Sequence, residues 1–270
     1  GTTQITRSPD RLLVAEYVAR FIKDAGIMRD GFSFQAGAGG IALAFVQFLK
    51  QMMQEAGVRA RFVRGGSTQY LVDLLKEGLT DYILDGQTFD LAGVTSIASD
   101  PRHVATSPFT SYNYHGKGNF ASMVDASVLG ATEVDLGFNA NVNTHSDGVL
   151  LHGIGGWQNC LFAACSILAV PSFRDRIPVI VDEVTTMTGP GELIDVVVTE
   201  RGIAINPGRQ DLLDQVSDSD LPIRTIAEIK DEVEQIMGGK PEPARLTDNP
   251  VAIVKWVDGT VLDTVWQVEE

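Results

Sequence analysis

The residues best suited to chemistry lie in a glycine-rich stretch, residues 139–159, with the sequence Asn-Ala-Asn-Val-Asn-Thr-His-Ser-Asp-Gly-Val-Leu-Leu-His-Gly-Ile-Gly-Gly-Trp-Gln-Asn. A strand-like run at 134–142 opens it, and an apolar run that predicts a helix at about 156–170 closes it. A glycine turn that enters a helix offers free backbone N–H groups and the positive end of the helix dipole, which together favour anions. A turn needed only for close packing of the helix on the sheet is the alternative interpretation.

A second stretch repeats this arrangement nearer the N-terminus. A predicted strand at 31–34 runs into Gln35-Ala36-Gly37-Ala38-Gly39-Gly40, and a predicted helix follows at 41–56. Neither turn has the spacing Gly-x-Gly-x-x-Gly, and no Lys-Ser or Lys-Thr follows, which excludes a P-loop. Asp182 ends a predicted strand where a dinucleotide fold places its ribose-binding acid, but the first turn has no such acid, which disfavours dinucleotide binding.

Other polar residues give weaker signals. The tripeptide His145-Ser146-Asp147 contains the residue types of a catalytic triad, but sequence neighbours point apart, so it does not predict one. His145 and His152 lack partners at metal-ligand spacing, so no metal site is predicted. Glu200 and Arg201 end a predicted strand, where α/β proteins bind ligands, although a solvated strand end explains them equally well.

Composition limits the classes of function. The 270 residues carry a formal net charge of −14, which argues against binding to nucleic acid or anionic membranes. Two cysteines, Cys160 and Cys165, lie in one apolar run and fit a reducing compartment. No apolar run reaches the length of a membrane span, and no signal-peptide pattern is present, so a cytoplasmic location is predicted.

The alternation of helix and strand patterns predicts an α/β fold with a mainly parallel sheet and helices on both faces. The strands expected in this sheet lie near 32–34, 60–64, 82–84, 126–130, 136–142 and 178–182. Helices are expected near 9–24, 69–77, 91–98, 211–215 and 225–237, besides those already named. A hairpin or a bent strand pair is expected at 193–199 and 202–205, and a hairpin at 251–266 around Asp258-Gly259. One domain, residues 1–270, is predicted, with a weak sub-boundary near 116–118.

Several separated motifs together carry a resemblance to known proteins: Phe34-Gln35-x-Gly37-x-Gly39-Gly40, His152-Gly153-Ile154-Gly155-Gly156, the run from Val198 to Pro207, Asn139-x-Asn141-Val142, Ser146-Asp147-Gly148-Val149-Leu150 and Trp266-Gln267-Val268. In this order they resemble the CoA-transferase superfamily, and within it most closely the citrate lyase alpha-chain family. The resemblance covers essentially all 270 residues but only the carboxy-terminal half of the family chain. It implies the CoA-transferase (NagB/RpiA-like) fold.

The resemblance also implies a reaction. In citrate lyase the alpha chain exchanges acetate for citrate on the thioester of an acyl-carrier protein, whose prosthetic group resembles CoA, and the beta chain then cleaves the citryl thioester. The implied partners are citrate, acetyl-CoA or the acetyl-carrier protein, the beta and gamma chains, and the missing amino-terminal half. No tightly bound cofactor is implied, because CoA or the carrier-bound group is a substrate.

Site residues follow from the same resemblance. Related CoA-transferases use a glutamate nucleophile at a position that corresponds to Gly65 or Gly66, where no carboxylate is present. This departure favours direct attack of a citrate carboxylate on the acetyl thioester, through a mixed anhydride. The catalytic residues implied are Gly37, Gly39, Gly40, Gly65 and Gly66. Those implied in substrate or CoA binding are Gln35, Arg64, Asn139, Asn141, Ser146, Asp147, Gly153, Gly155, Gly156, Asn159, Glu200 and Arg201.

Three points stay open from the sequence. Citrate needs a cationic partner, and Arg64, Arg201 and Lys117 are equal candidates. A stand-alone acyl-CoA hydrolase or CoA-transferase, with Glu183 or Glu200 as its carboxylate, is an alternative function. A non-catalytic half-domain with the same fold is another.

Overall fold

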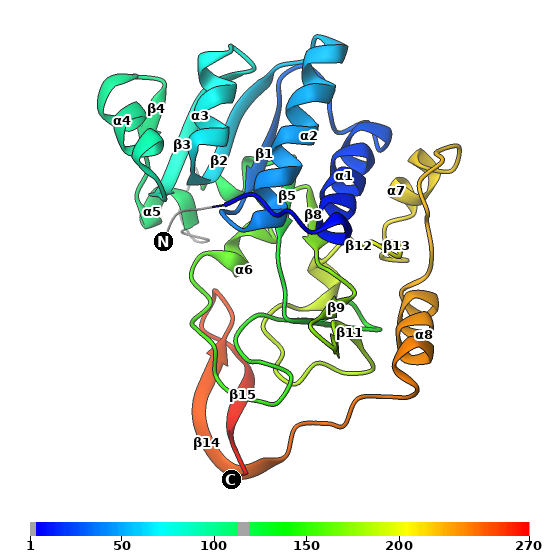
Figure 1. Cartoon of the computed structure of the whole chain (residues 1–270). Helices are drawn as coiled ribbons and strands as arrows, with labels where there is room; N and C mark the ends of the chain where they lie inside the picture. The colour runs from blue at the N-terminus through cyan, green and yellow to red at the C-terminus, as the bar shows by residue number, and fades with distance from the viewer. Residues whose placement is uncertain (1–3, 113–118, 270) are drawn as a thin grey trace.

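A central sheet organises the chain. Within residues 4–112 and 119–269, which the computed structural model describes, eight strands form one sheet in the order β13-β12-β8-β5-β1-β2-β3-β4 (Figure 1). All neighbouring pairs are parallel except β12 and β13, which form an antiparallel hairpin at one edge. The predicted mainly parallel sheet is therefore confirmed. Its strands are β1 Phe32–Ala36, β2 Ala60–Ser67, β3 Thr80–Thr88, β4 His103–Ala105, β5 Ala126–Leu129, β8 Cys165–Ala169, β12 Val196–Thr199 and β13 Gly202–Ile205.

The direction in which the chain adds strands to the sheet reverses after β4, so that the strands on the two sides of β1 are added in opposite directions. From β1 the chain moves outward through β2, β3 and β4, and it then returns to the opposite side of β1 as β5. The loops that leave β1 and β5 therefore run to opposite sides. Ligands of open α/β sheets bind in the crevice that forms at such a switch point, at the carboxyl ends of the strands.

Helices cover both faces of the sheet, as predicted. The helices are α1 Pro9–Asp24, α2 Gly40–Ala56, α3 Gln69–Lys76, α4 Leu91–Ser99, α5 Pro108–Tyr112, α6 Trp157–Cys160, α7 Gln210–Gln215 and α8 Ile226–Met237, with short 3-10 turns at Ala121–Met123 and Gly191–Leu193. Helices α1, α2 and α3 pack on one face (Figure 1). Successive residues of one strand enter different cores, because Ile167 of β8 joins the α1–α2 core whereas Leu168 joins a second core.

The second core packs small elements against the other face. It combines α6, α8 and a three-stranded sheet in the order β11-β6-β7. The strands of the small sheets are β6 Glu133–Asp135, β7 Ala140–Asn141, β9 Phe173–Arg174, β10 Ile177–Pro178 and β11 Ile180–Val181. In this way the second core supports the loops that approach the carboxyl ends of β5 and β8.

Three sequence predictions about the sheet are wrong. The apolar run at 156–170 forms only the short helix α6 and then the central strand β8, not one helix. A strand that is buried on both faces is apolar throughout, so periodicity does not distinguish it from a buried helix. The runs at 136–142 and 178–182 contribute short strands to the small sheet rather than to the main one, and β4, β8, β12 and β13 take the remaining places.

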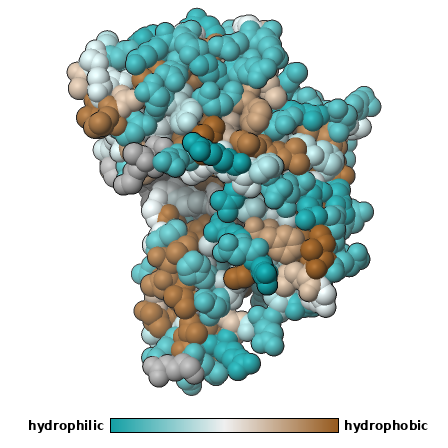
Figure 2. All heavy atoms as spheres, viewed as in Figure 1, coloured by the Kyte–Doolittle hydropathy of each residue, from teal (hydrophilic) through white to brown (hydrophobic). Residues whose placement is uncertain are grey.

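The predicted hairpin near the C-terminus is confirmed as β14 Leu246–Lys255 and β15 Val261–Val268. It lies below the main sheet (Figure 1) and contacts the glycine-rich stretch, since a Cβ on Gly148 would lie 2.5 Å from Leu246. Figure 2 shows apolar atoms gathered over this hairpin, where Val251 and Ile253 are exposed. No described helix is long and apolar enough to cross a membrane. The predicted sub-boundary at 116–118 lies outside the described residues.

Candidate functional site

A cavity of about 840 Å³ opens at the carboxyl ends of β1, β5 and β8, at the switch point of the sheet. Its walls come from the turn and first residues of α2, from Gly130 and Thr132 after β5, and from Pro171 after β8. Trp157, the first residue of α6, forms another part of the wall and donates its indole N–H to the carbonyl of Gly130 at 2.8 Å. The site therefore combines loops from both halves of the sheet.

The first glycine turn lines this cavity, as the sequence suggested for a ligand site. Gly39 is the N-cap of α2, and no side chain caps the helix there. The first N–H groups of the helix have no intrahelical acceptor, so they and the positive end of the dipole face the cavity at Ile41 and Ala42. A Cβ on Gly37 or Gly39 would meet nothing within 4 Å, so these glycines leave that space open.

Gly40 has a different environment. The N-terminal segment passes over it, and Thr6 donates its backbone N–H to the Gly40 carbonyl at 3.2 Å. A Cβ on Gly40 would lie only 3.1 Å from that nitrogen. The absence of a side chain at Gly40 thus serves packing as well as access to the cavity.

Gly65 and Gly66 have no free space for a side chain while Ala36 and Phe89 keep their present positions. Gly65 has a φ of +122°, and a Cβ there would lie 2.2 Å from the carbonyl oxygen of Ala36. A Cβ on Gly66 would lie 2.1 Å from the ring of Phe89. Neither glycine lines the cavity. A glutamate could not be accommodated at either position without rearranging β1 or Phe89.

Gln35 and Arg64 lie side by side in neighbouring strands and are both buried. Arg64 donates to the carbonyl of Ser111 at 3.5 Å, and Gln35 adjoins Gly65. Neither residue lines the cavity, so the structure places this pair within the central strands β1 and β2 rather than in the cavity wall. Lys117, the remaining cationic candidate apart from Arg201, lies outside the described residues.

The second glycine turn does not line the cavity. Gly153, Gly155 and Gly156 lie in a largely exposed loop that leads into α6, and only the next residue, Trp157, reaches the cavity wall. Gly155 has a φ of +60°, which glycine adopts without strain, so the turn itself requires this residue. Asn159 is buried within α6 and is likewise absent from the wall.

The polar residues between these turns divide into two groups. Ser146 and Asp147 line the cavity, together with His145. Asp147 also accepts the backbone N–H of Val149 at 3.0 Å, which shapes the local turn.

Asn139 and Asn141 instead hold the preceding loop. Asn139 donates to Asp135 at 3.1 Å and accepts the backbone N–H of Gly191 at 2.9 Å. Asn141 is fully buried and donates to Glu133 at 2.8 Å. These amides position the loop that carries Ser146 and Asp147, and they do not line the cavity.

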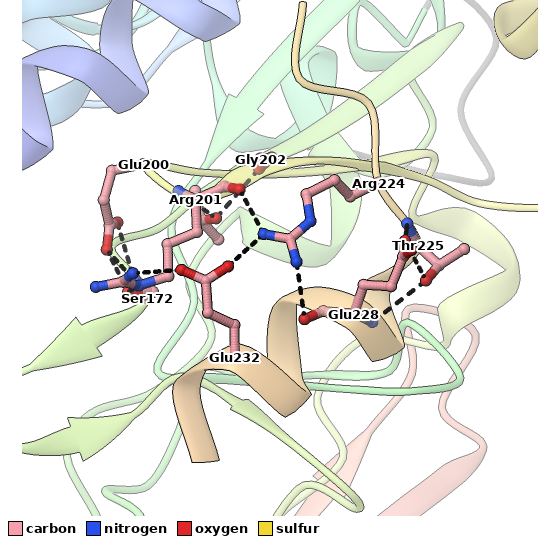
Figure 3. Close-up of polar contacts among 9 residues, drawn as sticks. Ser172, Glu200, Arg201, Gly202, Arg224, Thr225, Glu228 and Glu232 are labelled. Carbon is pink, nitrogen blue, oxygen red and sulfur yellow. Dashed lines mark hydrogen bonds and ion pairs between the residues drawn. The ribbon is translucent and has the colours of Figure 1, made fainter. Parts of the chain in front are cut away.

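Glu200 and Arg201 belong to a polar cluster at the turn of the β12–β13 hairpin (Figure 3). Glu200 accepts the backbone N–H of Ser172 at 2.9 Å and its hydroxyl as well. Arg201 donates to Glu232 of α8 at 2.7 Å, and Arg224 donates to the same carboxylate at 2.5 Å. These contacts tie α8 to the sheet edge, and neither Glu200 nor Arg201 lines the cavity.

Sequence reasoning missed two arginines of the cavity wall, Arg11 in the first turn of α1 and Arg174 at the end of β9. No motif marks them, since each becomes part of the site only through packing of distant segments. The cysteines are not candidate nucleophiles, because burial raises the pKa of Cys160 to about 11 and also raises that of Cys165. In the part of the chain that is described, no three His, Cys, Asp or Glu side chains are grouped to hold a metal ion.

An open cavity, an uncapped helix N-terminus and a parallel sheet with a switch point together define an α/β protein with the architecture of the CoA-transferases, whose cavity is suited to an anionic ligand. Comparison with known proteins is specific. The chain belongs to the citrate lyase alpha-subunit family, since the profile described as "Citrate lyase, alpha subunit (CitF)" matches residues 1–268. This confirms the resemblance inferred from the motifs.

Individual relatives agree with this assignment. The citrate lyase alpha chains of Haemophilus influenzae and Klebsiella pneumoniae are 40% and 39% identical over the whole of this chain, which covers 54% and 53% of theirs. A crystal structure described as an alpha subunit of citrate lyase in complex with citrate, from Streptococcus mutans, superposes with a TM-score of 0.97 at 40% identity and covers all of this chain. The chain therefore spans about half the length of the relatives it matches.

Proposed function

We propose that this chain forms one half of a citrate CoA-transferase site, which exchanges acetate for citrate on an acyl thioester. A citrate carboxylate oxygen would attack the acetyl carbonyl, the C–S bond would break, and the thiolate would leave a mixed anhydride. The thiolate would then attack the citryl carbonyl of the anhydride and release acetate. Acetyl thioester and citrate would thus become citryl thioester and acetate, with no acyl-enzyme between them.

The observation that carries this proposal is the uncapped N-terminus of α2 at the cavity. Both carbonyl additions develop negative charge on oxygen, and preorganised backbone N–H groups are well suited to stabilise it. Gly37 and Gly39 leave the approach open. The cavity of about 840 Å³ is large enough to hold an acceptor beside the end of a pantetheine arm.

The closed environment of Gly65 and Gly66 supports the direct route over a covalent one. The hydrolase alternative would need a carboxylate nucleophile. Glu200 already accepts two hydrogen bonds from Ser172, and Glu183 lines a separate pocket. Two carboxylates, Asp147 and Asp175, do line the cavity, and acetyl-CoA labelling of the intact protein tests whether either one acts as a nucleophile.

The substrates and partners follow as part of the same proposal. CoA, or a CoA-like group on an acyl-carrier protein, would be a substrate rather than a bound cofactor. The beta and gamma chains of citrate lyase, and the half of the alpha chain that extends beyond this match in the relatives, would be its partners. A cytoplasmic location stays a prediction from composition.

An exchange assay tests the proposed function. The chain is incubated with acetyl-CoA and citrate, alone and with the complementary half of the Klebsiella pneumoniae alpha chain, and citryl-CoA is measured by mass spectrometry. Citryl-CoA formation that depends on the complementary half is expected. Release of free CoA without citrate would favour a hydrolase, and no citryl-CoA with both halves present would refute the transferase.

A further inference from the structure

The cavity contains two cationic side chains that the glycine turn does not explain. Arg11 comes from the first turn of α1, and Arg174 ends β9. Strand β9 pairs with β10 through a two-residue turn, in which Asp175 has a φ of +56° and Arg174 lies opposite Ile177. This tight hairpin holds Arg174 at the cavity wall, whereas Arg176, two residues on, is exposed and does not line the cavity.

Arg174 differs from the comparable arginines of this chain. Four other half-buried arginines each have a carboxylate partner: Arg20 has Asp220, Arg201 has Glu232 at 2.7 Å, Arg209 has Asp195 at 2.7 Å, and Arg224 has Glu232 at 2.5 Å. Arg174 instead donates to the neutral carbonyl of Ala131 at 2.5 Å. Within residues 4–112 and 119–269, neither Arg174 nor Arg11 has a carboxylate oxygen within 4.0 Å.

The electrostatic environment favours an anion between the two arginines. Burial lowers the pKa of Arg174, and the charge of Arg11 lowers it further, so both effects oppose the charged form. An anion held between the guanidinium groups would offset both costs. The acidic side chains of the wall, Asp147 and Asp175, stay beyond 4.0 Å of either guanidinium, so they do not fill this position.

The geometry points to Arg174, with Arg11 beside it, as the binding site for a carboxylate of the acyl acceptor. A guanidinium presents its donors in a planar fork that matches a carboxylate in bidentate geometry. With one carboxylate held by the arginines, a second carboxylate of the same molecule can face the N-terminus of α2 across the cavity. The site therefore selects di- and tricarboxylates over monocarboxylates such as acetate. Citrate as the particular acceptor rests on the proposed function, but selection for polycarboxylates does not.

Binding measurements without turnover test this inference. Calorimetric titrations with citrate, tricarballylate, acetate and CoA are made on the wild-type chain and on Arg174→Gln, Arg174→Lys and Arg176→Gln. Circular dichroism and thermal melting show that each variant is folded. Arg174→Gln should weaken citrate and tricarballylate binding roughly tenfold to a hundredfold, the range for a lost charge-assisted bidentate contact. Arg174→Lys keeps the positive charge but loses the planar fork of donors. Its affinity for citrate and tricarballylate should therefore lie between those of the wild type and Arg174→Gln.

The control and the ligands separate the possible outcomes. Arg176→Gln removes a charge two residues away and should leave all affinities unchanged, and CoA binding should be the same in every variant. A loss of CoA affinity alone in Arg174→Gln would mean that the guanidinium binds a phosphate and would overturn the inference. So would unchanged polycarboxylate affinity, or no wild-type binding of any polycarboxylate. If tricarballylate binding depends on Arg174 but the exchange assay fails, the inference stands and the proposed function does not.

Discussion

At the scale of single residues, the proposed site depends on a missing side chain at Gly39. The backbone φ there is −74°, which any residue adopts, and a Cβ would meet nothing within 4 Å. Gly39→Val should therefore fold normally while its branched side chain blocks the first N–H groups of α2. We expect citrate or CoA affinity to fall at least tenfold, about 1.4 kcal/mol, measured by calorimetry on protein whose circular dichroism matches the wild type.

Gly153 supplies a matched control for this prediction. It is exposed, a Cβ on it would also meet nothing within 4 Å, and it lies outside the cavity wall. Gly153→Val should keep full affinity. An equal loss at Gly153 would show that the second glycine turn belongs to the binding surface, as the sequence alone predicted.

Asp85 is a buried charge whose contribution to stability should depend on pH. Burial raises the pKa of Asp85, but hydrogen bonds from His103, Thr88, Ser67 and the backbone N–H of Gln87 outweigh it, so the pKa is lowered from the usual value of an aspartate. A lowered pKa means that the charged form stabilises the fold above about pH 4, and that this stability is lost as the pH falls through the folded-state value.

Asp85→Asn should accordingly reduce the free energy of unfolding by about 1–3 kcal/mol at pH 7. The difference from the wild type should shrink as the pH is lowered toward 3. Urea unfolding at several pH values measures it, with the exposed Asp248→Asn as the control that should show little change at any pH. A difference that stays constant from pH 7 to pH 3 would contradict the assigned ionisation.

Part of the cavity wall could be predicted residue by residue, and part could not. Gly37 and Gly39 were identified from a local motif, because a glycine turn before a helix has a recognisable pattern, and Ser146 was implied by the family resemblance. Arg11 and Arg174 carry no such pattern. They share a cavity only because α1 packs against β8 while the β9–β10 hairpin follows β8, and that arrangement is a property of the fold.

At the scale of elements, helices were predicted well and short strands poorly. Helices α1 and α2 match the expected ranges because a helical period extends over several turns. Strands such as β7 and β9 contain two residues and show no period at all. The run at 156–170 was correctly identified as apolar. Its strand β8 is buried on both faces, so it lacks the alternation of polar and apolar residues that distinguishes a strand from a helix.

Helix α8 offers an element-scale prediction, because a capping box begins it. The hydroxyl of Thr225 accepts the backbone N–H of Glu228 at 3.2 Å, and Glu228 accepts the backbone N–H of Thr225 at 2.8 Å. Thr225→Ala should lower the free energy of unfolding by about 1 kcal/mol, since one N–H of the first turn loses its acceptor. Denaturant unfolding measures this change.

Thr260→Ala, at an exposed position in the β14–β15 turn, is the control and should change stability little. Because α8 carries Glu232, which binds Arg201 and Arg224, a loosened helix start should also weaken the cluster at the β12–β13 turn (Figure 3). The cavity lies elsewhere, so citrate affinity should stay unchanged. A variant as stable as the wild type would mean that tertiary contacts alone fix this helix.

At the scale of the whole molecule, the chain matches about half of each relative, and the cavity described above is lined by residues of that half alone. A reaction without a covalent intermediate must hold donor and acceptor together in near-attack geometry. The described cavity supplies an uncapped helix N-terminus and two arginines for this purpose. We therefore expect binding by the chain alone to be measurable and turnover to be poor.

The last prediction is that this chain forms no covalent acyl-enzyme. A covalent mechanism needs an activated nucleophile in the cavity. The position expected for a glutamate is closed at Gly65 and Gly66, and the buried cysteines have raised pKa values. The protein is incubated with acetyl-CoA, treated with hydroxylamine or borohydride, and its intact mass is measured. An unmodified mass is expected, with citryl-CoA formation recovered when the complementary half is added. A stoichiometric adduct on Asp147, Asp175, Glu183 or Glu200 would overturn the direct route and restore the covalent hydrolase or transferase, because only an enzyme carboxyl activated as an anhydride or as a CoA thioester gives that product.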